Sequence, residues 1–460
     1  MPRLLLPLGL ILIASAAASW VGRPRAAEAP APPADATKKE AFAPVGVAGC
    51  AAAACHHGNE PRGTKGSEYS TWIAVDPHAK AFAALYKPES ALMHEKMRGD
   101  NKGAHRNPLC LKCHGMGDAV DRESAMQSDG VGCERCHGNA EKWKSTHYLD
   151  RFDRKQGFVD LRKLPVRVES CVKCHVGEGS MEVDHDLIAA GHPRLRFEYA
   201  AYAANYPRHW AETPLNKSTD DEVRGWLLGQ VVSARAAAEL LAHHADPKRD
   251  SWPEFAEYDC AACHHELKAK ETFRTKRDLD LAEKRRKGEK PALGRLPWGT
   301  WYNPLLPTLA TVTEADRAKL DASLKDLGTL MQKSSPNRAN VREQAKALAA
   351  SLRVWEEQIA VRPFAPTDTS ALMKSLAARS ELVGTGWDGG TQVYLGLASL
   401  NYHLSEGKKK STGFVPPLSA MRTGLIDAYP KNPRPRYDVP SNYDPKPLLK
   451  SMTKILDIKE

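Results

Sequence analysis

Long apolar runs are scarce in this chain of 460 residues. Beyond one stretch near the N-terminus, from Leu4 to Val21, no segment is apolar enough to cross a bilayer. No cysteine follows that stretch closely, which argues against a lipid-modified N-terminus. Cysteines are also missing from everything after Pro291, so any chemistry that depends on thiols lies before that residue.

The N-terminal apolar stretch has the pattern of an export signal. Arg3 supplies the positive start, and small residues at 16–18 and 27–29 offer cleavage sites. We expect residues 1–29 to be a signal peptide, and the alternative is an uncleaved N-terminal anchor. In either case the rest of the chain is exported, to the periplasm or an equivalent compartment. The Pro- and Ala-rich residues 30–46 predict an extended linker.

The remaining sequence predicts a mostly α fold with two parts. Residues 47–268 are rich in Cys, His and Gly and predict short helices between long loops. The clearest helix there runs from Glu222 to Ala245, with Thr219 and Glu222 forming a capping box. Residues 291–460 predict a C-terminal helical domain with no evident chemistry. Helical spacing of Leu, Ala and Val covers residues 316–330, 340–360, 370–383 and 392–404, and a Pro-rich coil precedes a last helix at 448–458.

All ten cysteines fall into five motifs, and in each motif a histidine follows the second cysteine directly. Four motifs have two residues between the cysteines, and the first in the chain has four. The motifs are Cys50-x4-Cys55-His56, Cys110-x2-Cys113-His114, Cys133-x2-Cys136-His137, Cys171-x2-Cys174-His175 and Cys260-x2-Cys263-His264.

This arrangement is what covalent haem attachment requires. Two thiols on one helical turn reach the two vinyl groups of a porphyrin, and the next residue aims its imidazole at the iron. We expect five haem c sites, the Cys50 motif being the least regular. Zinc sites and disulfides remain alternatives, but neither explains a histidine after every pair. An exported chain rarely meets nucleic acid, so we expect no nucleic-acid partner, and haem propionates would offset part of the formal net charge of +10.

The five motif histidines leave twelve others that could supply the second axial ligand of each iron. His78 follows Asp-Pro, which predicts that it lies in the first turn of a helix. His147 is close enough to the Cys133 motif to fold back over a haem. His185 and His192 are seven residues apart and would share one face of a helix, and His244 ends the predicted helix. We expect these five as candidate distal ligands and interpret His94, His209 and His403 as structural.

Three segments resemble the cytochrome c554 family of tetrahaem proteins. They are Gly130 to Gly138, Trp72 to His78 and Ala190 to Glu198, and the resemblance covers about residues 47–266. It implies a mostly helical fold around stacked haem pairs, several bis-histidine irons, sometimes one five-coordinate haem, and electron relay toward membrane acceptors. By that resemblance His78, His147 and His192 would be distal ligands. The longer first motif, the fifth motif and the C-terminal domain depart from the family pattern.

Electron transfer is the function that these features favour. The partners would be redox proteins, including a membrane-bound respiratory complex. One alternative is a multihaem oxidoreductase that acts on a small nitrogen compound at one open iron. No Cys-x-x-Cys-Lys motif is present, so the motifs give no sign of such a catalytic haem, and an enzyme is the less favoured interpretation. A third hypothesis makes the C-terminal domain a docking module.

Overall fold

The computed structural model describes residues 42–97, 103–149, 152–154, 156–211, 220–260, 296–311, 313, 316–405, 413–428 and 443–458. Phe42–Glu460 form one compact unit. The described residues form α-helices and short 3-10 helices, and their only β-structure is two isolated bridges. The prediction of a mostly α protein is confirmed.

The cysteine-rich half consists of short helices joined by loops, apart from one long helix at its end. Its α-helices are α1 (Glu68–Val75), α2 (Pro88–Lys96), α3 (Pro108–His114), α4 (Cys133–His137), α5 (Leu164–His175), α6 (His185–Ala190), α7 (Tyr199–Asn205) and α8 (Asp221–His244). Its 3-10 helices are η1 (Val47–Gly49), η2 (Pro77–Lys80), η3 (Ala83–Tyr86), η4 (Ala104–Arg106), η5 (Gly117–Ala119), η6 (Ala125–Asp129) and η7 (Phe255–Glu257).

The C-terminal half is helical, as predicted. Its helices are α10 (Leu306–Ala310), α11 (Arg317–Met331), α12 (Arg338–Val361), α13 (Pro366–Ala377), α14 (Ser380–Thr385), α15 (Trp387–Ser405), α16 (Val415–Asp427) and α17 (Lys446–Leu456). The segment predicted as one helix at 370–383 is divided between α13 and α14. Helices α10 and α16 were not predicted.

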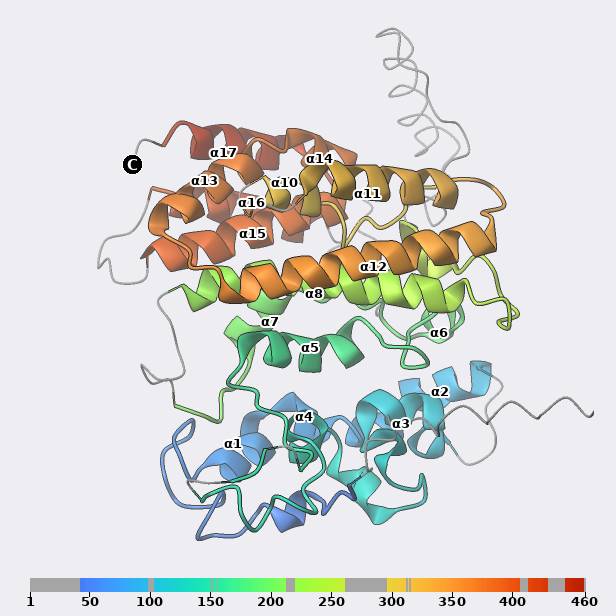
Figure 1. Cartoon of the computed structure of the whole chain (residues 1–460), viewed down its shortest axis with the longest axis vertical. Coiled ribbons are helices and arrows are strands. Elements are labelled where there is room, and N and C mark those ends of the chain that lie inside the picture. The colour runs from blue at the N-terminus through green and yellow to red at the C-terminus, as the bar shows by residue number, and fades with distance from the viewer. Residues whose placement is uncertain are drawn as a thin grey trace, which may run out of the picture. The chain divides into compact units, whose positions relative to one another are not determined.

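Helix α8 is the centre of the hydrophobic core. Its bounds differ by one residue from those predicted, but it is buried on nearly all sides and not along one stripe. The reason is that α5, α7, α12 and α15 all contact it, with α12 running along its length (Figure 1). At Gly229 the approach to α7 is so close that an added Cβ would lie 2.5 Å from the Cβ of Tyr199.

The start of α8 is tied to the C-terminal half. Thr219, predicted to cap the helix, lies outside the described residues, and Asp220 is the N-cap residue. Its carboxylate accepts a hydrogen bond from the backbone N–H of Phe364, which lies after α12 (2.9 Å). This bond helps to hold the two halves in register.

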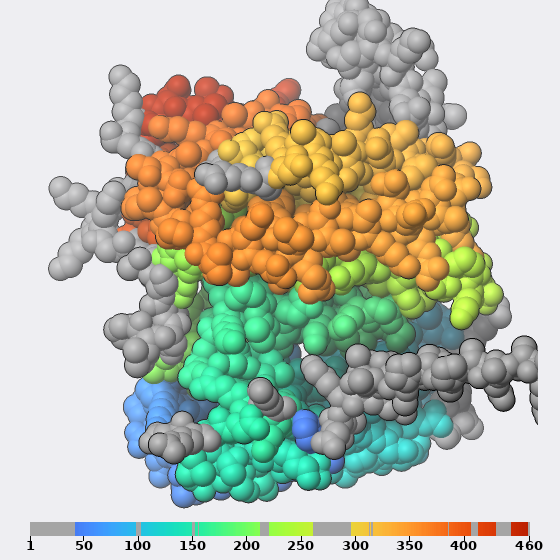
Figure 2. All heavy atoms as spheres, in the orientation of Figure 1, coloured from blue at the N-terminus to red at the C-terminus, as the bar shows by residue number. Residues whose placement is uncertain are grey.

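A buried arginine joins three helices at the middle of α8. The side chain of Arg235 is 1% exposed and forms ion pairs with Glu169 on α5, Glu239 on α8 and Glu356 on α12. Helix α5 ends in the Cys171 motif, and in Figure 2 its green residues lie between the blue N-terminal segments and the orange C-terminal helices. The ion pairs therefore couple a motif-bearing helix to the C-terminal half.

The two predicted parts of the chain share one core, because α8 belongs to residues 47–268 and α12 to residues 291–460. Residues 269–290, which lie between the two predicted parts, are outside the described residues, as are the predicted signal peptide and most of the linker at 30–46. No helix within the described ranges combines the length and the apolar character that crossing a bilayer requires.

Candidate haem sites in one cavity

A single large cavity adjoins four of the five cysteine motifs. Its volume is about 2420 Å³, whereas a pocket for one small molecule holds roughly 300–1,000 Å³. Its lining includes both cysteines and the following histidine of the Cys50, Cys110, Cys133 and Cys171 motifs. We name each site for its first cysteine. Trp143 also lines the cavity, and its buried Nε1 has no hydrogen-bond partner, as expected if an occupant supplies one.

Local sequence explains why three of these motifs present their groups together. His114, His137 and His175 are the last residues of α3, α4 and α5, so each Cys-x-x-Cys pair lies on the final turn of a helix. Residues three apart on a helix lie on the same face, and both thiols therefore project to one side. The Cys50 motif, with its longer spacing, forms turns after η1.

Each of the four motif histidines faces one other histidine across the cavity. The ring centroids are 5.9 Å apart for His56 and His147, 6.4 Å for His114 and His192, 6.2 Å for His137 and His209, and 6.1 Å for His175 and His78. The first pair is nearly parallel, at 20°, and the other three are steep, at 84°, 69° and 78°.

These separations fit an iron held between two imidazoles. A metal–imidazole bond is about 2 Å, and the ring centre lies about 1.1 Å behind the nitrogen, so two rings on one iron are roughly 6.3 Å apart. All four pairs lie within half an ångström of that value. The donor set therefore fits haem c, with two thiols and two imidazoles at each of four sites.

Hydrogen bonds at Nδ1 orient five of these rings so that Nε2 is the nitrogen left to bind a metal. Two rings donate to carboxylates and three donate to backbone carbonyl oxygens. The carboxylate bonds are His56 to Glu68 (3.1 Å) and His78 to Asp76 (2.9 Å). The carbonyl bonds are His114 to Ala81 (3.1 Å), His147 to Lys144 (2.8 Å) and His192 to Pro193 (2.8 Å). Such partners fix the tautomer and ring orientation of a metal-binding histidine.

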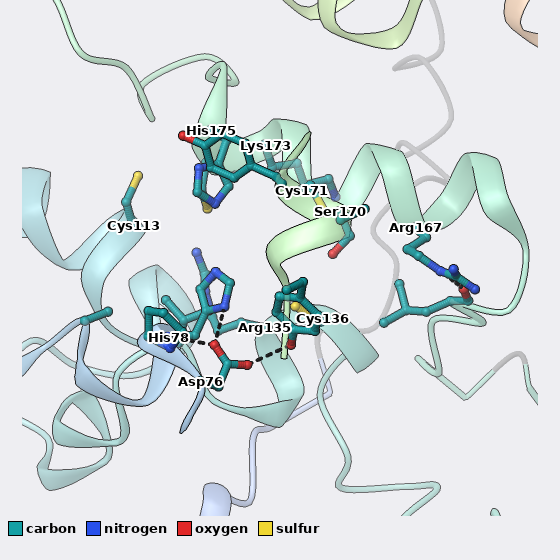
Figure 3. A pocket seen from close by; sticks show the side chains of 18 of the residues that line it. Asp76, His78, Cys113, Arg135, Cys136, Arg167, Ser170, Cys171, Lys173 and His175 are labelled. Atoms are coloured by element: carbon teal, nitrogen blue, oxygen red, sulfur yellow. Dashed lines mark hydrogen bonds and ion pairs between the residues drawn. The ribbon is translucent and has the colours of Figure 1, made fainter. Parts of the chain in front are cut away.

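Figure 3 shows one site at close range, with His175 and His78 facing each other across the cavity. His78 lies in η2, whose N-cap residue Asp76 accepts hydrogen bonds from the backbone N–H and the ring of His78. The predicted placement of His78 in the first turn of a helix is confirmed. Asp76 also accepts a bond from the Tyr206 hydroxyl (2.7 Å), so its orientation is set from two sides.

Burial keeps most of the motif rings neutral, which is the form that binds a metal. It lowers the pKa of His114 and His209, and it lowers the pKa of His137 and His175 to about 4. His56 differs, because its hydrogen bond to Glu68 raises the pKa. The carboxylate behind His56 makes that ring more basic than the others.

His209 is a candidate ligand that the sequence pattern does not indicate. The pattern favours a structural role for it, but it lies opposite His137 at a separation similar to that of the other pairs. It belongs to no helix and follows α7 in the segment Tyr206-Pro207-Arg208-His209-Trp210. Aromatic residues on both sides of a loop histidine were the signal that could have identified it.

His244 and His185 are placed away from the cavity lining. His244 is hydrogen-bonded through both ring nitrogens, to Glu182 and to Glu257, and this leaves no nitrogen for iron in the structure. His185 begins α6, with its ring 5.7 Å from that of Phe255. Because α6 ends at Ala190, His192 lies beyond it, and the predicted shared helical face does not form.

The fifth motif lies mostly outside the described residues, which include neither Cys263 nor His264. Cys260 does not line the cavity, and the guanidinium of Arg194 lies 3.8 Å from its sulfur. A haem site at Cys260 therefore stays a prediction.

The thiols that shift one another's pKa indicate which cavity sites are neighbours. The Cys133 thiol lowers the pKa of Cys50, and the Cys174 thiol raises the pKa of Cys113. Cys136 interacts electrostatically with Cys171 and Cys174. The neighbours in space are thus the Cys50, Cys133, Cys171 and Cys110 sites, in that order.

The two alternatives to haem find no support among the described residues. Each described cysteine is free, so no disulfide forms among them. Those residues also contain no group of three or more His, Cys, Asp or Glu that could hold a bare metal ion. An iron within a porphyrin needs only two protein ligands, which is the number that each site offers.

Cysteine pairs at the spacing of haem attachment, beside paired imidazoles, define the class of c-type cytochromes, proteins that attach haem covalently, hold its iron and act in electron transfer. Residues 50–138 match the family of cytochrome c554 and c-prime, which confirms the resemblance seen in the sequence. The matched segment contains the first three motifs and His78. No curated protein and no solved structure matches the chain.

Proposed function

We propose that this chain is an exported pentahaem c-type cytochrome that relays electrons between redox proteins. The observation that carries the proposal is the set of four histidine pairs in one cavity, each at the separation that an iron requires. A bis-histidine haem iron gains or loses one electron while both axial ligands stay bound. The protein's role is then to hold both imidazoles and to exclude other ligands.

The same pairs weigh against an enzyme at the cavity sites. A multihaem oxidoreductase needs one iron whose distal side is open to a small substrate. Each described motif histidine faces a second imidazole, so an open iron would have to be at the Cys260 site. Relay along the order Cys50, Cys133, Cys171 and Cys110 is the function that this arrangement supports best.

Electron paramagnetic resonance of the oxidised, full-length protein tests the proposal. When the two imidazole planes on one iron are parallel, they interact with one of two iron d orbitals and separate the energies of the two. When the planes are perpendicular, the energies of the two orbitals stay close. We therefore expect only low-spin signals from the four cavity sites, one rhombic from the His56 pair and strongly anisotropic ones from the three steep pairs. A high-spin signal that responds to nitrite, hydroxylamine or nitric oxide would refute the pure relay.

Intact mass tests the stoichiometry. Five additions of one haem each support five occupied sites. If the mass shows four haems, Cys→Ser variants of each motif identify the empty one, because only a variant of an occupied motif loses a haem. The Cys50 and Cys260 motifs are the first to test.

A further inference from the structure

Two neighbouring residues of the Cys133 motif carry opposite charges and contact two different motif regions, that of Cys50 and that of Cys110. Glu134 is 4% exposed, and its carboxylate accepts backbone N–H bonds from Val45 (2.9 Å), Gly46 (2.8 Å) and Ala140 (2.7 Å). The first two donors lie just before Cys50 in the chain. Glu134 thus places a buried negative charge between the Cys50 and Cys133 sites.

Arg135 extends toward the Cys110 motif. Its guanidinium donates to the carbonyl oxygens of Lys112 (2.5 Å) and Met116 (3.4 Å), which lie on either side of Cys113 and His114. Together with Cys113, its positive charge also lowers the pKa of the Cys174 thiol. Figure 3 labels Arg135, Cys113 and Cys136 among the residues that line the cavity.

The two charges act on different sets of thiols. The Glu134 carboxylate interacts electrostatically with Cys50 and Cys133. The Arg135 guanidinium interacts with Cys113, Cys136 and Cys174, and these sets overlap only at the Cys133 site itself. Glu134 is buried and Arg135 is half-buried, and solvent screens such charges less than exposed ones, so each of them acts most strongly on the thiols beside it.

The axial histidines reinforce the difference between the two end sites. At the Cys50 site the ring of His56 donates to the carboxylate of Glu68, which makes the imidazole a stronger donor and favours ferric iron. At the Cys110 site His114 and His192 donate to neutral backbone carbonyls. Lys144 also interacts with Cys50 and opposes Glu134, but it is exposed, so solvent and salt weaken its effect.

The Cys171 site lies between these extremes. Asp76 accepts a hydrogen bond from His78 and disfavours an added electron there, while Arg135 favours one. The gradient is therefore clearest between the two end sites.

We propose that Glu134 and Arg135 give the four cavity sites graded reduction potentials, lowest at the Cys50 site and highest at the Cys110 site, and so direct electrons between them. This inference rests on the proposed electron relay. Ferrous iron at the Cys50 site becomes ferric, and ferric iron at the Cys110 site becomes ferrous, with no proton transferred and no bond broken. A one-electron protein donor then docks at the Cys50 end and a one-electron protein acceptor at the Cys110 end.

A redox titration of the haem-loaded protein followed by electron paramagnetic resonance tests the gradient, because the near-parallel His56 pair gives the Cys50 site its own signal. We expect Glu134→Gln to raise the potential of that signal by about 59 mV, a tenfold change in electron distribution. The matched control is Glu141→Gln. Glu141 is exposed and also accepts a bond from the N-terminal segment, at Ala43 (3.0 Å).

Arg135→Gln should lower the highest potential in the titration and leave the Cys50 signal nearly unchanged. Its control is Arg106→Gln, a surface charge near the Cys110 site with a 48% exposed side chain. Equal shifts at all sites, or shifts no larger than those of the controls, would overturn the proposal. If the Arg135→Gln protein loses haem, Arg135→Lys serves as the test instead. It keeps the positive charge, so the reduction potentials should stay unchanged, and a fall in the potentials would overturn the proposal.

The outcome is separable from that of the proposed relay. A high-spin wild-type protein, or one with too few haems, contradicts the relay. If the protein is low-spin with its full haem content, and neither the Glu134 nor the Arg135 variant changes the reduction potentials, only the gradient is contradicted.

Discussion

Replacing His209 with alanine tests the most specific feature of the ligand arrangement. His209 faces His137 at 6.2 Å, close to the roughly 6.3 Å that two imidazoles on one iron require. Alanine lacks the ring and cannot span that distance. We therefore expect one iron in each chain, and no more than one, to change from low-spin to high-spin.

The assay is quantitative electron paramagnetic resonance of the oxidised protein, with haem content checked by intact mass. The new high-spin signal should integrate to one iron per chain, and added imidazole should restore the low-spin form by occupying the space of the missing side chain. His105→Ala is the control, because His105 stacks on Tyr86 and lies outside the cavity lining. A low-spin His209→Ala protein with its full haem content would refute the assignment.

Three further predictions concern the framework. Arg235→Leu leaves three carboxylates around a side chain that is 1% exposed, so we expect a loss of about 3 kcal/mol, measured as a lower thermal midpoint. Burial lowers the pKa of His244, but its two carboxylate partners raise it to about 9, above the usual 6.5, so its stabilisation is full below pH 6.5 and lost as pH rises through 9. The difference in thermal midpoint between wild type and His244→Gln should shrink over that range, and a constant difference would contradict this. Gly229→Ala should destabilise by about 1–3 kcal/mol because its Cβ meets Tyr199, whereas Gly328→Ala, with its nearest neighbour at 3.9 Å, should be neutral or stabilising.

Much of the helical framework could be predicted from the sequence. Apolar spacing located α8 and α12 to within about two residues, because long amphipathic patterns are strong signals. Helix α16 is not evident from the sequence, because the prolines at its start are typical of coil, although proline also fits the first turn of a helix. The break at Ala378 between α13 and α14 contains no proline or glycine, so no helix-breaking residue indicates it in the sequence.

The cavity sites were predictable to different extents. The motif cysteines and histidines follow from spacing alone, since the chemistry of attachment is local in the chain. Distal ligands come from distant loops, and their pairing depends on tertiary structure. His78 had a local signal in its Asp-Pro turn, whereas His209 had only its aromatic neighbours. His244 had helical position in its favour, but its carboxylate partners are far away in sequence.

The shared core around α8 limits how far the cysteine-rich region can be treated as a portable module. A chain cut after residue 268 would keep all five motifs and lose α12, which covers α8 along its length. Leu227, Val231 and Ala234, all fully buried, belong to the core that α8 shares with the lost helices. Their exposure would weaken α8, and with it α5, whose last turn carries the Cys171 site. A shortened protein that carries the cavity sites therefore needs the C-terminal helices that pack on α8 as well.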